Sequence, residues 1–445
     1  MKMKMKYSFI GMLLLPCFSY AATYNVLEEK NDLSFTLDSF GSRVQSGSKE
    51  VITLIEQAEV AFKKGQMNES ETLLLQAIAK VKVKGNLKGE AKLISILGAV
   101  YAKQQQAEKL LPLAGDLLKR FPRNSMALSI LAGVQIVNKQ DAQAEKTLRK
   151  IISQEPKDTN HRLLLINLIA KVVSREKEIK PLLDQVLNIQ ANNPKALLIT
   201  ARLQLKNKKF KQAAATIQTI EGFYPKQAIA HQLKGDLYLA EKKHAKALES
   251  YQQAYQIAPN NKVLYLLVDL MKVQGKGTNA LVLLNDELKK NSKNSAVHFK
   301  LASIFQQLKD YKQAEKHYRA ILAEKADNPL VLNNLAWVYL QQNKPEALGL
   351  AKRAYENTPK SNSIADTYGT ILIKQGDKKL GLSILEKTAA LVPKSDEIQY
   401  HLALAYSANG NKKKAIEILQ KIQPSKQYFA EKKQASAWLK TLQGN

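Results

Sequence analysis

The sequence predicts an all-α solenoid of paired helices, and three observations support this fold class. Gly and Pro are sparse, at 19 and 13 of 445 residues, while the helix formers Ala, Leu, Lys and Gln are abundant. A chain of this length needs either several domains or a repeat array, because a single core stops growing well before it. Proline recurs at a fixed interval, and small residues recur between the prolines, which favours the array.

The first 21 residues are predicted to be a secretory signal peptide. Lys2, Lys4 and Lys6 precede a short apolar stretch, and Ala21 ends a small-residue motif after which cleavage is expected. The apolar stretch is shorter than the roughly 20 residues that span a bilayer. We therefore expect export to the periplasm, no transmembrane span after cleavage, and a flexible Gly- and Ser-containing lead-in over residues 22–50.

The single cysteine, Cys17, lies inside this predicted signal. Leu14-Leu15-Pro16-Cys17 resembles a bacterial lipobox, but Pro16 stands where such a motif prefers a small residue. Ordinary cleavage is therefore favoured over lipid anchoring at Cys17. A chain cleaved after Ala21 has no cysteine, which excludes disulfides, thiol catalysis and Cys metal ligands.

The repeat is the strongest signal in the sequence. Three pairs of prolines are 34 residues apart: Pro122 and Pro156, Pro225 and Pro259, and Pro359 and Pro393. Residues 51–424 hold eleven periods of this length and are predicted to form the solenoid. Residues 425–445, in which Trp438 and Leu439 are apolar, are predicted to form a C-terminal capping helix and tail.

The clearest copy of the repeat is residues 228–259. Gly235, Ala247 and Ala254 stand at positions 8, 20 and 27 of this copy, where small side chains let two antiparallel helices approach closely. Tyrosines at positions 11 and 24 fill the space between the helices. Pro259, at position 32, ends the second helix because proline cannot donate a backbone hydrogen bond.

These positions resemble the signature of the tetratricopeptide repeat (TPR) family, whose period is 34 residues. The resemblance extends over residues 51–424, although residues 159–194 depart from it, with Ile166 where a small residue is expected. It implies a right-handed superhelix with a concave groove lined mainly by the first helix of each pair. It also implies a binding scaffold for other proteins or extended peptides.

A narrower resemblance concerns the last three repeats. Their sequences resemble TPR proteins of bacterial PEP-CTERM sorting and exopolysaccharide systems in five runs: 333–339, 347–351, 354–355, 366–369 and 398–405. This resemblance implies a periplasmic assembly or export factor for exopolysaccharide or surface proteins. Proteins of that group often look like lipoproteins and are often longer, and the chain departs from both features.

The resemblance also implies a partner-binding groove. Positions 2, 5, 9 and 12 of the first helices face the groove in TPR proteins, and aromatic rings flanked by amide and basic groups suit extended peptides or sugars. The predicted groove residues are Lys195, Arg202, Gln232, Asp236, Tyr265, Asp269, Lys272, Phe299, Ser303, Gln306, Asn333, Trp337, Gln341 and Tyr400. The alternative is that Tyr265, Phe299 and Trp337 pack between neighbouring first helices, and the sequence leaves both open.

The chain is strongly basic, with 68 Lys and Arg against 39 Asp and Glu and a formal net charge of +29. This charge motivates an alternative function, direct electrostatic binding of an acidic polysaccharide or a membrane surface. The basic residues are spread along the whole chain, which fits solvated helix faces equally well. The predicted export signal argues against a nucleic-acid partner.

The sequence predicts no catalytic, cofactor or metal site. The six histidines show no set of metal ligands at helical spacing. Gly275-Lys276-Gly277-Thr278 lacks the spacing of a phosphate-binding loop, and no nucleophile elbow or carboxylate pair is evident. We therefore predict a protein without enzymatic activity and without a cofactor.

Overall fold

The computed structural model describes residues 48–425, 427, 429 and 431–444, and over these residues it contains helices and no strands. The predicted signal peptide, Cys17 and nearly all of the predicted lead-in lie outside the described residues. The all-α fold class is confirmed.

The chain divides into two compact units at the turn between Lys243 and His244. The described part of the N-terminal unit contains two short 3₁₀ helices, η1 (Ala107–Lys109) and η2 (Val173–Glu178). Its α-helices are α2 (Lys49–Lys63), α3 (Met67–Val83), α4 (Leu87–Gln104), α5 (Leu110–Arg120), α6 (Ser125–Val137), α7 (Asp141–Gln154), α8 (Asn160–Ala170), α9 (Ile179–Ile189), α10 (Pro194–Lys206), α11 (Phe210–Phe223) and α12 (Ala228–Ala240).

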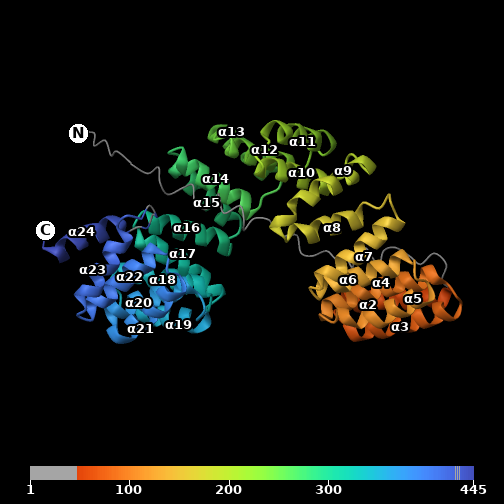
Figure 1. Cartoon of the computed structure of the whole chain (residues 1–445), viewed down its shortest axis with the longest axis horizontal. Coiled ribbons are helices and arrows are strands. Elements are labelled where there is room, and N and C mark those ends of the chain that lie inside the picture. Colours follow the sequence, from red (N-terminus) through yellow and green to blue (C-terminus); the bar gives the residue numbers. More distant parts are fainter. Residues whose placement is uncertain (1–47, 426, 428, 430, 445) are drawn as a thin grey trace. The chain divides into compact units, whose positions relative to one another are not determined.

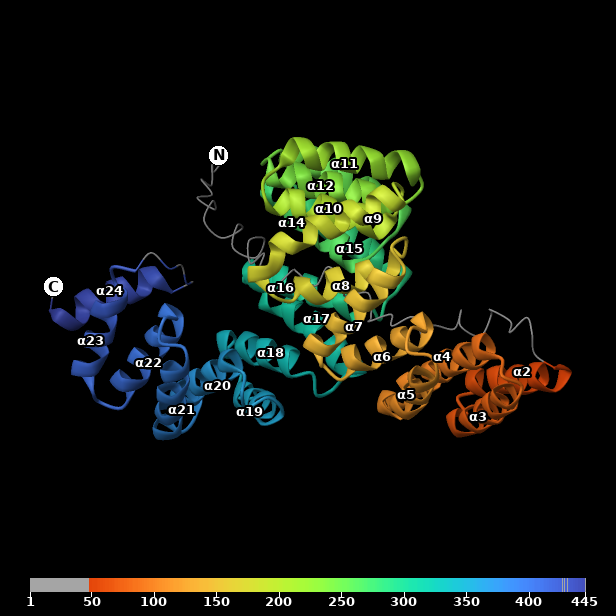
Figure 2. The ribbon, with the colours of Figure 1, turned by 45° about the vertical axis from the view of Figure 1, so that its right-hand side comes forward.

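The C-terminal unit is also entirely helical over its described residues. Figures 1 and 2 both show α18, α20 and α22 side by side, and these first helices contact one another in that order. The helices of this unit are α13 (His244–Ile257), α14 (Asn261–Val273), α15 (Gly277–Lys290), α16 (Ser295–Gln307), α17 (Tyr311–Glu324), α18 (Pro329–Gln341), α19 (Ala347–Asn357), α20 (Asn362–Gln375), α21 (Lys378–Leu391), α22 (Asp396–Ala408), α23 (Lys412–Ile422) and α24 (Lys432–Gln443).

Among the described residues, α2 to α23 follow one another in the sequence as twenty-two α-helices, the number that eleven pairs require, and α24 follows as a single helix. The small residues at positions 8 and 20 are predicted to lie where the two helices of a pair meet. In four copies each of these residues is at most 1% exposed: Ala132 and Ala144, Ala201 and Ala213, Ala302 and Ala314, and Ala403 and Ala415. The prediction that small side chains permit close helix pairing is confirmed for these copies.

The first helices begin and end in a recurring way that the period alone did not reveal. Five of them are preceded by an asparagine whose side-chain oxygen accepts a hydrogen bond from the backbone N–H three residues later: Asn124, Asn193, Asn260, Asn294 and Asn328. At the other end, position 15 takes a left-handed conformation, with φ near +60° in Lys139, Lys208, Lys242, Lys309 and Asn343. Glycine, which tolerates this conformation best, occupies the same position at Gly275 and Gly410.

The irregular copy at residues 159–194 is explained by η2. This 3₁₀ helix occupies the turn between α8 and α9 and lengthens it. Arg175 of η2 donates to Glu145 of α7 at 2.7 and 2.8 Å and to Glu178 at 2.7 Å. The hydrogen bond from Arg175 outweighs burial and, together with Arg149, lowers the pKa of Glu145 to about 2. The longer turn is therefore tied to the preceding repeat by ion pairs.

Gly381→Ala is expected to destabilise the C-terminal unit by about 1–3 kcal/mol. Gly369 and Gly381 occupy positions 8 and 20 of one repeat, and a Cβ added at Gly381 would lie 2.9 Å from the Gly369 carbonyl oxygen and 2.9 Å from Ile373 Cδ1. The backbone oxygen cannot rotate away, so α20 and α21 would have to separate. Thermal unfolding followed by circular dichroism measures the loss.

The matched control for this substitution is Gly349→Ala on α19. A Cβ at Gly349 meets no atom within 4 Å among the described residues. Alanine is a better helix former than glycine, so this variant is expected to gain roughly 0.5–1 kcal/mol. Equal effects of the two substitutions would contradict the close approach of α20 and α21.

Candidate functional site

The predicted groove residues are divided between the two units. Lys195, Arg202, Gln232 and Asp236 belong to α10 and α12 of the N-terminal unit, where Lys195 is exposed and the other three are half-buried. The remaining ten belong to first helices of the C-terminal unit, from α14 to α22. The C-terminal unit therefore carries most of the predicted site.

A charged cluster joins α14 and α16. Lys300 Nζ lies 2.7 Å from Asp269 Oδ1 and 5.0 Å from the ring centroid of Tyr265. The Tyr265 hydroxyl donates to the backbone oxygen of Ala296, and burial raises the pKa of this phenol. Tyr265 thus has the polar partner that its hydroxyl requires. Lys300 was missed in the sequence because it stands at position 6, outside the four positions expected to face the groove.

Lys272 continues this cluster along α14. Its Nζ donates to Gln307 Oε1 at 2.7 Å, so it contacts the neighbour of the predicted Gln306. Burial lowers the pKa of Lys272, the nearby charge of Asp269 opposes this effect, and the charge of Lys300 adds to it. The cluster places two ammonium groups and one carboxylate on the first helices of adjacent repeats.

Phe299 and Trp337 pack against the core of the C-terminal unit while remaining half-buried. Phe299 meets the ring of Tyr318 edge-on at 5.9 Å, and Gln306 accepts a 2.9 Å hydrogen bond from the Tyr318 hydroxyl. The packing interpretation therefore holds for the buried part of these two rings. Ser303 and Gln341 are also half-buried on the same helices.

Two predicted groove residues are corrected by the structure. Asn333 and Tyr400 are only 6% and 7% exposed, so they lie inside the protein and not on an open face. Tyr400 is covered because Phe429 and Trp438, from the segment that ends in α24, pack on its ring at 5.7 and 6.2 Å. Asn333 donates to Asn334 Oδ1 at 3.3 Å, and its own Oδ1 is buried without a partner among the described residues.

A buried ion pair links α20 and α22. His401 Nδ1 lies 2.8 and 2.9 Å from the two carboxylate oxygens of Asp366. Burial disfavours the imidazolium, but the hydrogen bond and charge of Asp366, with the charges of Glu431 and Glu397, raise the pKa of His401 above its ordinary value. The two residues are 35 positions apart, and this spacing in a 34-residue repeat was the signal that could have revealed the pair.

A pocket of about 310 Å³ lies beside this ion pair. Its wall is formed by α20, α22 and α24. The lining residues are Thr370, Ile373, Lys374, His401, Leu404, Ser407, Ala408 and Trp438. The repeat pattern carries no signal for this pocket, because it depends on where α24 lies against α22.

A second histidine contact joins α16 and α17. The Nδ1 atoms of His298 and His317 are 2.9 Å apart, and the ring of Phe305 stacks on His317 at 5.7 Å. Burial, with the charges of His298 and Lys316, lowers the pKa of His317 to about 4. His317 is therefore neutral in the folded protein near neutral pH.

His317→Phe is expected to reduce the loss of unfolding free energy that the wild type shows as the solution becomes acidic. In the wild type the folded pKa of about 4 lies below the ordinary value of about 6.5. The unfolded chain therefore binds more protons between these values, and stability falls as pH falls from about 6.5 to about 4. Urea unfolding of both proteins across this range isolates the contribution of His317. Parallel profiles would contradict it.

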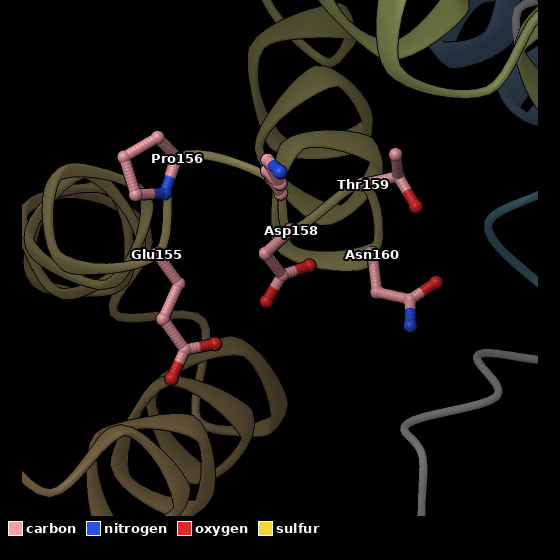
Figure 3. Close-up of a pocket in the computed structure, with 6 residues that line it drawn as sticks. Glu155, Pro156, Asp158, Thr159 and Asn160 are labelled. Carbon is pink, nitrogen blue, oxygen red and sulfur yellow. The ribbon is translucent and has the colours of Figure 1, made fainter.

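The N-terminal unit contains a Ser–His–Asp arrangement. Ser129 Oγ lies 2.7 Å from His161 Nε2, and His161 Nδ1 is bonded to Asp158 Oδ2. Asp158 belongs to the turn 155–160, which borders an open hollow of about 650 Å³. Figure 3 shows the side chains of Glu155, Asp158 and Asn160 directed to the same side of this turn. The order of the three groups is that of a serine hydrolase.

The contacts of this arrangement are structural. The Ser129 hydroxyl donates its one proton to the backbone oxygen of Ser125 at 2.7 Å, and Asp158 Oδ1 accepts from the backbone N–H of His161 at 3.1 Å, as a helix cap does. Ser129 lies inside α6, where the backbone N–H groups that an oxyanion hole needs are already bonded in the helix. The arrangement therefore ties α6 to α8. Its signal in the sequence was the three-residue spacing of Asp158 and His161.

Comparison with known families identifies the repeat. Residues 191–262 and 299–362 match a family model described as tetratricopeptide repeat, and residues 372–440 match a second model with the same description. The chain contains tetratricopeptide repeats. TPR arrays act as scaffolds that bind other proteins or peptides on extended surfaces. No curated protein matches this TPR protein in sequence.

Solved structures with a similar course of the chain are distant in sequence. The APC/C hetero-tetramer Cut9–Hcn1 is 13% identical, with 92% of this TPR protein and 98% of that chain covered and a TM-score of 0.41. A tetratricopeptide repeat protein from Parabacteroides merdae is 15% identical, with 56% and 96% covered and a TM-score of 0.41. The type IV pilus biogenesis factor PilW is 17% identical, with 46% and 94% covered and a TM-score of 0.39.

Two further features of the described residues concern membranes and metals. Among helices α2 to α24, none is both long and apolar enough to cross a bilayer. Within the same part of the TPR protein, no group of three or more His, Cys, Asp or Glu side chains is arranged to hold a metal ion.

Proposed function

We propose that this TPR protein is a periplasmic scaffold that binds an extended segment of a partner polypeptide along the first helices of its C-terminal unit. The observation that carries the proposal is the row of half-buried side chains on α14, α16 and α18. Tyr265, Phe299 and Trp337 each come from a different one of these consecutive first helices, and each is half-buried.

The chemistry of this face suits a peptide. An extended peptide presents alternating side chains and unpaired backbone amides, and it needs apolar contacts together with side-chain hydrogen bonds. The half-buried aromatic rings supply the apolar contacts. Ser303, Gln306 and Gln341, on the same helices, supply the side-chain hydrogen-bonding groups. The cluster of Asp269, Lys272 and Lys300 adds charge at one end.

The cellular role is proposed from the sequence. The predicted signal peptide supports a periplasmic location, and the resemblance of the last three repeats supports a role in assembly or export of exopolysaccharide or surface proteins. Fractionation tests the location: the chain is expected in the periplasmic fraction with the mass that results from cleavage after Ala21. Recovery of the uncleaved chain in the cytosol would reject it.

Trp337→Ala is expected to weaken binding of a partner captured from envelope extracts by roughly 30-fold, the loss typical of a central aromatic contact. Phe223→Ala is the control, because Phe223 is a 50% exposed aromatic on a second helix of the other unit. Affinity measured by calorimetry or surface plasmon resonance checks both variants. Equal losses would contradict a site on the first helices.

The net charge of +29 supports a second candidate, electrostatic binding of an anionic glycan or membrane surface. This function predicts a steep loss of binding as salt rises and little effect of Trp337→Ala. The peptide function predicts the reverse. Titration of the same immobilised protein with envelope protein and with acidic polysaccharide, at low and high salt, separates the two.

A further inference from the structure

Three turns lie next to one another along one edge of the C-terminal unit, each between the two helices of a repeat. The Gln375 side chain donates to the Lys344 backbone oxygen at 3.0 Å, and the Asn409 side chain donates to the Lys378 backbone oxygen at 3.0 Å. These bonds join the turns α18–α19, α20–α21 and α22–α23 in series. Because contacting helices stand roughly 8–10 Å apart, about one Debye length, the charges on neighbouring turns reinforce one another.

The last two of these turns, residues 374–380 and 408–414, carry five exposed side chains that we call the lysine patch: Lys374, Lys378, Lys379, Lys412 and Lys413. In the part of the chain that the structure describes, none of these five ammonium groups forms an ion pair or a hydrogen bond. Lys414 is not counted with them, because its Nζ lies 4.7 Å from the ring centroid of Tyr406. The patch therefore presents unpaired positive charge to the solvent.

The acidic residue of these two turns does not neutralise the patch. Asp377 Oδ1 accepts from the backbone N–H groups of Lys379 and Leu380 at 2.9 and 3.1 Å, so this carboxylate caps α21. The turns between successive pairs on the opposite edge differ in charge. Residues 357–361 and 391–397 contain Lys360 and Lys394 balanced by two acidic residues. The positive charge of the last two repeats is therefore concentrated on one edge.

The turn one repeat earlier shows what is missing from the patch. Three lysines stand 34 residues apart: Lys344, Lys378 and Lys412. Lys344 Nζ lies 2.6 Å from Oε2 of Glu315 in the preceding repeat. One and two periods after Glu315 stand Gly349 and Ser383, which carry no charge. The last two turns thus lack the acidic residue that pairs with the corresponding lysine of the turn before them.

The lysine patch does not stabilise the helices on which it stands. Lys378 and Lys379 begin α21, and Lys412 and Lys413 begin α23. Neither helix has an acidic residue in its first turn, although the helix dipole favours acidic residues there and disfavours basic ones. An anionic partner placed against these turns would be attracted both by the ammonium groups and by the two helix ends.

The same edge also exposes an apolar side chain. Leu380 is 44% exposed and directly follows Lys378 and Lys379. A phospholipid bilayer with anionic headgroups attracts lysines and accepts an apolar side chain at its interface. A soluble acidic polysaccharide supplies the negative charge but no hydrocarbon layer. The combination of the lysine patch with Leu380 therefore favours the bilayer.

We propose that the lysine patch and Leu380 dock the C-terminal unit on the surface of an anionic phospholipid bilayer. The inference rests on the second candidate function, electrostatic binding, to which it gives a site and a partner. It does not depend on the proposed peptide site, because that site consists of other residues on α14, α16 and α18.

The test uses residues 22–445, which include every described residue and omit the apolar stretch of the predicted signal peptide. Binding is measured by co-sedimentation with vesicles of phosphatidylcholine, either alone or mixed with phosphatidylglycerol. We expect binding to the mixed vesicles only. It should be lost when salt is raised from about 0.1 M to about 1 M, because the Debye length falls from about 10 Å to about 3 Å.

The decisive variant removes four charges of the lysine patch: Lys378→Gln, Lys379→Gln, Lys412→Gln and Lys413→Gln. Each lysine near an anionic surface contributes about fivefold, so the affinity for mixed vesicles is expected to fall about 100-fold or more. The matched control removes four exposed lysines from the turns between pairs in the same unit: Lys293→Gln, Lys325→Gln, Lys360→Gln and Lys394→Gln. It lowers the net charge equally and is expected to lose less than about fivefold. Circular dichroism verifies that both variants are folded.

Leu380→Gln separates a bilayer from a soluble polyanion. It is expected to weaken binding to the mixed vesicles by about fivefold, because a half-exposed leucine loses its place in the bilayer interface. Binding of soluble polygalacturonate, measured in parallel, is expected not to change. Polygalacturonate binding that depends on the lysine patch, without binding to the mixed vesicles, would overturn the proposal and assign the patch to an acidic polysaccharide.

The remaining outcomes distinguish this inference from the functions proposed above. Equal losses in the two four-lysine variants would overturn the patch and leave electrostatic binding by charge spread along the chain. Absence of binding to both the mixed vesicles and polygalacturonate would reject the second candidate function together with the patch. The peptide site is tested separately, by the effect of Trp337→Ala on a captured partner.

Discussion

Tyr318→Ala is expected to lower the free energy of unfolding of the C-terminal unit by about 3–5 kcal/mol, the cost of deleting a large buried aromatic ring. Tyr318 stands at position 24 of its repeat, on α17, and is 1% exposed. It belongs to a core cluster that includes residues of α16 and α18. Its removal leaves a cavity beside Ala302 and Ala336, which cannot extend to fill it. Urea unfolding followed by circular dichroism measures the loss as a lower midpoint.

Tyr318→Phe is the control for this experiment. It keeps the ring and removes only the 2.9 Å hydrogen bond to Gln306 Oε1, so the expected cost is about 1 kcal/mol. A loss as large as that of Tyr318→Ala would show that the hydrogen bond, and not packing between repeats, provides the stability at this position.

Asp366→Ala is expected to cost about 3–5 kcal/mol below a pH of about 6.5, where the buried His401 imidazolium is left without its partner. The pKa of His401 is raised in the folded protein, so the stabilisation by the ion pair is fully present below the ordinary pKa of about 6.5. It is lost as pH rises through the raised value. The difference between wild type and variant should therefore shrink as the solution becomes alkaline.

The matched variant replaces both members of the pair. Asp366→Leu with His401→Phe removes the carboxylate and the imidazole together, and apolar side chains of similar volume often restore the stability that breaking a buried pair removes. We expect the double variant to lose less than the sum of the single losses. Additive losses in urea unfolding, or a loss that is independent of pH, would contradict the coupling of the two residues.

The helix pairs could be predicted from the sequence because the repeat period and the recurring small residues both indicate the contact between the two helices of a pair. Ala201 and Ala213, for example, recur at positions 8 and 20, and both are fully buried. The Asn helix caps and the left-handed residues at position 15 are equally regular. They are mostly polar, however, so they do not stand out in a pattern of apolar residues. Lys208, in the left-handed conformation at φ +56°, is an unremarkable polar residue in the sequence.

The site was harder to predict because it depends on contacts between repeats. The sequence placed Tyr400 on a groove, but the segment leading into α24 covers it with Phe429. Helix α24 begins at Lys432, so Phe429 precedes the helix that was expected to contain it. The pocket lined by Thr370 and Trp438 likewise needs three helices to meet. The register of the repeat predicts contacts between residues one period apart. It predicts nothing about a helix such as α24, which lies outside the repeat.

The close approach of Gly369 and Gly381 has a consequence for how a partner would be held. Both glycines fix α20 to α21 through backbone contact, and α20 is the helix that presents Asp366 and Thr370. One wall of the pocket is therefore preorganised, and any group that binds there has little conformational ordering to impose on it. Partners that compete for this wall would then have similar association rates and would differ chiefly in their dissociation rates.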